Sequence, residues 1–145
     1  LKKELFDMPV FGWGLRMLNP VAIDRSNSRS VLQILTEGQK KIEQGLHLIM
    51  FPEGGTVKID RNVKFKPSAA KLAINANVPI VLIAHNSGVF WPKGFWFRKP
   101  GLISIRILEV ISTKKYQDHD VRTLTDYIEE RINKEKEILV RLASG

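Results

Sequence analysis

The chain has 145 residues and a formal net charge of +8 at pH 7, from 23 Lys and Arg against 15 Asp and Glu. The absence of cysteine excludes disulfides and thiolate metal sites, and no apolar run approaches the roughly 18 residues that a membrane-spanning helix needs. The charge favours anionic partners, whether nucleic acid, phosphate-bearing substrates or acidic lipid surfaces.

The first half of the chain is predicted to alternate helices and strands. In order, it reads as a helix over 2–18 broken at Pro9, a short strand over 21–24, a helix from Ser28 or Ser30 to Gly45, and a strand over 46–51. Ser favours the position before a helix and Gly the position after it, which sets the bounds of the second helix.

The second half continues the alternation. It reads as a polar loop over 54–66, a helix opened by Pro67, a strand over 78–84, an aromatic loop over 86–101, a strand over 102–111, and an amphipathic helix from Asp118 or Asp120 to about Ala143. The last strand should carry Ile103, Ile105 and Ile107 on one face and polar residues on the other. The last helix should turn inward Val121, Leu124, Ile128, Ile132 and Leu139. This order predicts an α/β fold, with helices packed on a mixed, largely parallel sheet, over a single domain of residues 1–145.

Three short blocks follow or lie on the predicted strands. Phe51–Gly55 reads Phe-Pro-Glu-Gly-Gly, which places a carboxylate at a strand tip beside backbone that can approach a ligand closely. Upstream, Val21–Arg25 ends in Ile-Asp-Arg, and downstream Val78–Ala84 begins Val-Pro-Ile-Val.

In this order the blocks resemble the glycerolipid acyltransferase family, the 1-acylglycerol-3-phosphate acyltransferases. The resemblance implies an enzyme of phospholipid biosynthesis, membrane-associated at the cytoplasmic face. It would transfer a fatty acyl group from acyl-CoA or acyl carrier protein to the free hydroxyl of lysophosphatidate or a related lysophospholipid. It implies no metal and no cofactor apart from the acyl donor.

The family's first block, Asn-His-x4-Asp, carries the catalytic histidine and does not occur in the sequence. None of the three histidines, His47, His85 and His119, has an Asp five positions further on. We therefore expect a C-terminal part of a longer enzyme, truncated at its N-terminus, with no catalytic residue of its own and no activity alone. His47 is predicted to lie in the core, His85 to be structural or to line a pocket, and His119 to cap a helix.

The resemblance also implies the substrate-binding residues. Arg25 would clamp the acceptor phosphate, which a guanidinium can bind in a bidentate way, and Glu53 with Gly54 would support the glycerol phosphate. Lys66 precedes a helix N-terminus, where anions are favoured, and would be a second contact for phosphate or coenzyme A. For each of these side chains the alternative is an ordinary exposed loop residue.

One departure from the family pattern concerns the acceptor. The family continues Phe-Pro-Glu-Gly with Thr-Arg, whereas here Gly55 and Thr56 follow, with Thr56 in place of the Arg. Lys58 or Arg61 could supply the missing phosphate donor, or both could simply be solvated loop cations.

The segment 90–99 combines five aromatic residues with three cations. Such a mixture suits an anionic membrane interface, and the same pattern can stack single-stranded nucleic acid or cover a core. With the lipid resemblance we expect membrane contact and no nucleic acid. The rival function is a non-catalytic basic α/β module that binds anionic lipid or nucleic acid; the order of the blocks argues against it, and the missing base argues for it.

Overall fold

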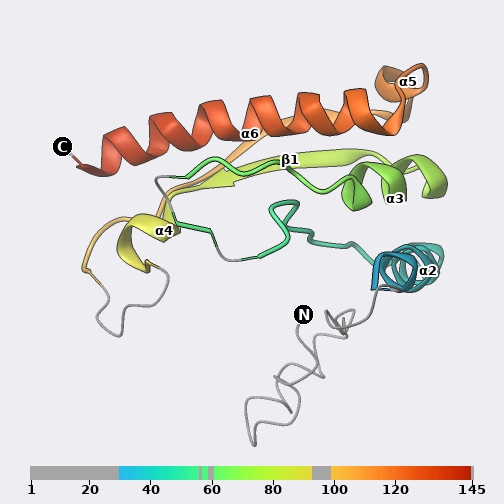
Figure 1. Ribbon diagram of the computed structural model, residues 1–145, viewed down its shortest axis with the longest axis horizontal. Helices are drawn as coiled ribbons and strands as arrows, with labels where there is room; N and C mark the ends of the chain where they lie inside the picture. Colours follow the sequence, from blue (N-terminus) through green and yellow to red (C-terminus); the bar gives the residue numbers. More distant parts are fainter. Residues whose placement is uncertain (1–29, 56, 59–60, 93–98, 145) are drawn as a thin grey trace, which may run out of the picture. The chain divides into compact units, whose positions relative to one another are not determined.

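The computed structural model describes residues 30–55, 57–58, 61–92 and 99–144 (Figure 1). The chain divides into two units, one ending at Ile49 and the other beginning at Met50. The elements predicted over 2–18 and 21–24 lie outside the described residues. The expectation of a single domain over 1–145 stays a prediction.

In the first unit, helix α2 (Ser30–Glu43) ends where the sequence predicts. Gly45 has φ 77°, a left-handed conformation that glycine adopts without steric cost. Its N–H donates to the carbonyl of Ile42 at 2.9 Å, and the N–H of Leu46 donates to that of Lys41 at 3.0 Å. These two bonds form a Schellman motif, which satisfies carbonyls that the helix end leaves free.

The predicted strand over 46–51 is wrong for the described chain. The described sheet consists of β1 and β2 and does not include this segment. Ile49 is 84% exposed and Phe51 is 66% exposed. An apolar run indicates burial, but a strand also needs a neighbouring backbone to complete its hydrogen bonds. His47, predicted to be a core histidine, is likewise exposed.

The second unit contains the sheet and four helices among its described residues. The strands are β1 (Ile80–His85) and β2 (Ile105–Ile111), and the helices are α3 (Ser68–Ala76), α4 (Ser87–Phe90), α5 (Thr113–Tyr116) and α6 (Val121–Ser144); the short turns of α4 and α5 flank β2 in sequence. β1 and β2 pair antiparallel, from Ile80 opposite Ile111 to His85 opposite Ile105, with an irregularity between Leu82 and Ile83. The α/β class is confirmed, and an antiparallel pair is compatible with a mixed sheet.

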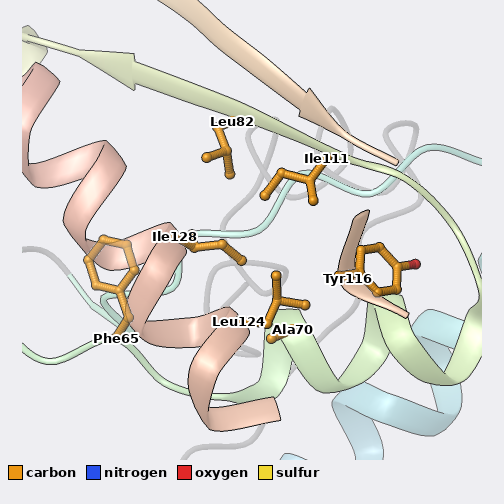
Figure 2. Packing of buried hydrophobic residues seen from close by; sticks show 7 residues of the cluster. All are labelled: Phe65, Ala70, Leu82, Ile111, Tyr116, Leu124 and Ile128. Carbon is orange, nitrogen blue, oxygen red and sulfur yellow. The ribbon is translucent and has the colours of Figure 1, made fainter. Parts of the chain in front are cut away.

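Helix α6 runs along one face of the two strands (Figure 1). It begins after Asp120, whose carboxylate accepts the N–H of Thr123 at 2.7 Å, so Asp120 rather than His119 caps it. The inward residues are those the helical period predicts, with Leu124, Ile128 and Leu139 buried. Leu124 and Ile128 belong to the core that Figure 2 shows, together with Phe65, Ala70, Leu82, Ile111 and Tyr116.

The predicted isoleucine face of β2 is not the face that packs on α6; Arg106 and Glu109 pair with α6, and Ile111 is buried in the core beside it. Arg106 pairs with Glu135, and Glu109 bonds to α6 as described below. The isoleucines on the other face stay exposed, with Ile105 at 68% and Ile107 at 71%. Ion pairs with α6 and the burial of Ile111 in the core thus both favour the face of the strand that the helix covers.

Glu109 is the centre of a polar network between β2, α5 and α6. Its Oε2 atom accepts a hydrogen bond from the ammonium of Lys115 at 2.7 Å. Its Oε1 atom accepts hydrogen bonds from the hydroxyl of Tyr127 at 2.8 Å and from the Nε–H of Arg131 at 3.1 Å. These donors, Lys115 first and then Tyr127, lower the pKa of Glu109 from 4.5 to about 2.

Replacing Glu109 by Gln should lower the free energy of unfolding at neutral pH by about 1–2 kcal/mol, because hydrogen bonds to a charged group are weakened. Since folding lowers this pKa, the carboxylate's contribution is present above pH 4.5 and is lost as pH falls towards about 2. The difference between native protein and Glu109→Gln should therefore shrink over that range in urea unfolding. The exposed Glu130→Gln is the control, and a pH-independent difference would contradict the role of the charge.

Candidate functional site

The Phe-Pro-Glu-Gly block forms a tight turn. The N–H of Gly54 donates to the carbonyl of Phe51 at 3.1 Å, which closes the turn around Pro52 and Glu53. Gly54 has φ 74°, a conformation that costs any residue with a Cβ about 1–2 kcal/mol. Glycine at this position thus has a conformational reason of its own, independent of any ligand.

Lys66 lies directly against this turn. Its N–H donates to the carbonyl of Pro52 at 2.8 Å. Its side chain crosses Gly54, since a Cβ added there would come within 2.5 Å of Cε and 3.0 Å of Nζ. The absence of a side chain at Gly54 therefore lets the ammonium of Lys66 lie beside the turn. This contact joins two residues that the sequence assigned to one site.

Helix α3 begins immediately after Lys66. Pro67 occupies its N-cap position with φ −72°, and no side chain caps the helix. The first N–H groups of a helix have no acceptor within it, and they carry the positive end of the helix dipole. Lys66 and the start of α3 together make a positively charged environment next to the Pro-Glu-Gly turn, as predicted for an anion contact.

His85, at the end of β1, contacts the same turn. Its ring lies edge-on to the ring of Phe51, with centroids 6.5 Å apart and an interplanar angle of 77°. Its Nδ1 atom shares a hydrogen bond of 2.8 Å with the hydroxyl of Ser87. These contacts agree with the structural role predicted for His85, and a pocket-lining role stays a prediction. The sequence analysis missed Ser87 as its partner, because nothing in a Ser two residues after a His distinguishes it from a loop residue.

The remaining predicted site residues are placed as follows. Glu53 is half-buried in the turn, Gly55 is exposed, and Lys58 is exposed, with its carbonyl accepting the N–H of Arg61 at 3.1 Å. Arg25 and Thr56 lie outside the described residues. The structure thus brings Glu53, Gly54 and Lys66 together, and leaves the clamp role of Arg25 and the substitution at Thr56 as predictions.

A residue far away in sequence also reaches this region. Glu129 of α6 accepts the N–H of Phe65, the residue before Lys66, at 2.8 Å. The sequence analysis did not identify Glu129. Its only local signal is an acidic residue on an amphipathic helix, which usually indicates a solvated face.

No three His, Asp or Glu side chains of the described residues come together as a metal site would require. None of the helices in the described part of the chain is both long and apolar enough to cross a membrane.

Comparison with known proteins identifies the family of the chain. The family model described as Acyltransferase matches residues 1–86. The chain is 41% identical over 108 residues to a 1-acyl-sn-glycerol-3-phosphate acyltransferase of Pseudomonas aeruginosa, covering 74% of this chain and 42% of the relative. It is 33% identical over 129 residues to the enzyme of that name from Limnanthes douglasii, covering 88% of this chain and 45% of the relative. The chain thus spans less than half the length of these two relatives.

A solved structure gives the same result for the fold. The crystal structure of the 1-acyl-sn-glycerophosphate acyltransferase PlsC from Thermotoga maritima superposes with a TM-score of 0.80 at 28% identity, over 95% of this chain and 54% of that one. The α/β acyltransferase fold and the resemblance noted in the sequence are both confirmed. With the family model matching more than half of its residues, this chain belongs to the acyltransferase family.

Proposed function

We propose that this chain supplies the acceptor-binding half of an enzyme that acylates lysophosphatidate or a related lysophospholipid. The acyl group would come from a thioester on coenzyme A or acyl carrier protein, and the free thiol would leave. The relatives named above are 1-acyl-sn-glycerol-3-phosphate acyltransferases, which supports this choice of reaction.

The observation that carries the proposal is the contact of Lys66 with Gly54. It places an ammonium group beside a turn that bears a half-buried carboxylate, Glu53, and beside the start of α3. A glycerol phosphate presents an anion together with hydroxyl groups. The cation and the helix N-terminus would bind the phosphate, while the carboxylate of Glu53 would accept a hydrogen bond from a hydroxyl or support the turn.

The proton of the acceptor hydroxyl needs a general base, and the family assigns this role to the histidine of Asn-His-x4-Asp. That block is not within the 145 residues. We assign no catalytic residue to this chain, and we propose no metal or cofactor other than the acyl donor. His85 is engaged with Ser87 and Phe51, which suits a structural role.

The rival function, a non-catalytic basic module, is not favoured. The relatives reported above are named as enzymes, and the blocks that carry the resemblance lie within the matched residues 1–86. Acyl transfer in the protein with its native flanking sequence would support the enzyme, whereas salt-sensitive nucleic-acid binding without turnover would support the rival.

In that longer protein, Arg25→Ala should raise the KM for lysophosphatidate roughly 10- to 100-fold. This range corresponds to a lost charged hydrogen bond of about 1.5–3 kcal/mol. The KM for the acyl thioester should change little, because Arg25 is proposed to hold the acceptor phosphate. Steady-state kinetics with each substrate varied in turn measure the two constants, and equal effects on both would contradict an acceptor clamp.

Gly54→Ala should also weaken acceptor binding, because the new Cβ would displace the side chain of Lys66. Lys66→Ala removes the ammonium itself. If Gly54→Ala acts by displacing that ammonium, it should raise the acceptor KM little further in a protein that already carries Lys66→Ala. A double-mutant cycle on the acceptor KM tests this coupling. Lys71→Ala, an exposed lysine on α3, is the matched control; additive effects of the two site variants would show that Gly54→Ala acts through the backbone of the turn and not through Lys66.

Membrane association is part of the proposal, because the acceptor is a membrane lipid. The segment 90–99 lies partly outside the described residues, but Trp91 is 59% exposed. We expect the protein to co-sediment with anionic vesicles, more weakly at high salt. Trp96→Ala/Phe97→Ala should reduce this binding. Equal sedimentation of native protein and variant would show that the segment does not carry the contact.

A further inference from the structure

The short segment 61–66 connects the Pro-Glu-Gly turn to helix α6 through its backbone. The N–H of Phe65 donates to Oε2 of Glu129 at 2.8 Å, and the N–H of Lys66 donates to the carbonyl of Pro52 at 2.8 Å. The amide of Phe65 therefore binds helix α6, and the next amide, that of Lys66, binds the turn. The position of the ammonium of Lys66 depends on both bonds, because they fix the backbone from which its side chain starts.

The carboxylate of Glu129 is suited to this role. Its side chain is only 15% exposed, and the N–H of Phe65 is the main cause that lowers its pKa. Phe65 itself is buried in the core that Figure 2 shows, against α6. The hydrogen bond from its amide is thus partly buried, and a charged acceptor there is stronger than at the surface.

A second set of hydrogen bonds joins the segment 61–66 to α6, two helical turns after Glu129. The ammonium of Lys136 donates to Oδ1 of Asn62 at 2.8 Å and to the carbonyl of Arg61 at 3.4 Å. Glu129 and Lys136 lie two helical turns apart, so both fall on the same side of α6. The helix therefore holds the segment at two points, of which the Glu129 bond is adjacent to Lys66.

The other contact of Glu129 contributes little to this arrangement. Its Oε1 atom pairs with the ammonium of Lys64 at 3.1 Å, but the side chain of Lys64 is 85% exposed. Solvent and salt screen such a pair, which is why exposed ion pairs stabilise proteins only slightly. The bond to the amide of Phe65 is the contact that can transmit a constraint to the turn.

We propose that Glu129 is a positioning residue of the acceptor site, which holds Lys66 over Gly54 through the amide of Phe65. This inference rests on the proposed function of Lys66. Glu129 lies beyond residues 1–86, the part of the chain that the family model matches. Acceptor binding would then depend on a helix outside the matched blocks.

The test uses the protein with its native flanking sequence, lysophosphatidate as acceptor and palmitoyl-CoA as donor. Glu129→Ala should raise the acceptor KM about tenfold with little change in the donor KM, and should speed amide hydrogen exchange at Phe65 and Lys66. Glu129→Gln keeps an oxygen that can accept the N–H, so its acceptor KM should stay within about threefold of the native value. Lys64→Ala and Glu130→Ala, which leave the Phe65 bond intact, should behave as the native protein.

Several results would overturn the proposal. The proposal is contradicted if Glu129→Gln raises the acceptor KM as much as Glu129→Ala does, or if Lys64→Ala raises it equally. Either result would show that the hydrogen bond to the amide of Phe65 does not determine acceptor binding. A fall in kcat with both KM values unchanged would indicate lost folded protein only. If Glu129→Ala does not fold, Glu129→Asp replaces it, because the shorter side chain keeps the charge but withdraws it from the amide; unchanged kinetics and exchange in Glu129→Asp would equally contradict the proposal.

The Lys66→Ala variant separates this proposal from the proposed function. If Lys66→Ala leaves the acceptor KM unchanged, the acceptor site itself is misassigned. If Lys66→Ala raises it and Glu129→Ala does not, the acceptor site stands and only the positioning role of Glu129 fails.

Discussion

Two backbone amides, those of Phe65 and Lys66, connect the candidate site to the core of the second unit. The side chain of Phe65 lies in that core, its amide binds α6, and the next amide binds the Pro-Glu-Gly turn. A turn built around Pro and Gly has little apolar surface with which to fix itself. Its position is therefore set by hydrogen bonds from a neighbouring segment that the core does hold.

The same dependence on polar contacts governs how α6 lies on the sheet. A two-stranded sheet offers few apolar side chains to a helix, and those on the covered face, such as Leu82 and Ile111, alternate with charged residues. Glu109 and Arg106 pair with opposite charges on α6. These partners offset the cost of removing the two charged groups from water. Apolar burial and ion pairing thus act together to select one face of the strands for the helix.

These contacts explain how far the sequence could predict the structure. The C-terminal end of α2, the start of α6 and the inward face of α6 follow from local signals, namely Gly45, Asp120 and the helical period. The segment 46–51 could not be predicted in the same way, since a strand requires a partner that its own residues do not specify. At the site, Gly54 and Lys66 were recognisable from their block and from a helix start. Glu129 was not, because its bond to Phe65 spans 64 positions of the sequence and leaves no local pattern.

The ion pairs show which of the cations behind the net charge of +8 have a carboxylate partner. Several cations of the second unit have carboxylate partners, among them Lys64, Arg106, Lys115 and Arg131. Lys66 has none among the described residues, although the paired Lys64 is only two positions away. Glu129 pairs with the exposed Lys64 and also accepts the N–H of Phe65, the residue before Lys66. Among the described residues, the ammonium beside Gly54 thus has no carboxylate partner, which is consistent with the proposed binding of an anionic acceptor.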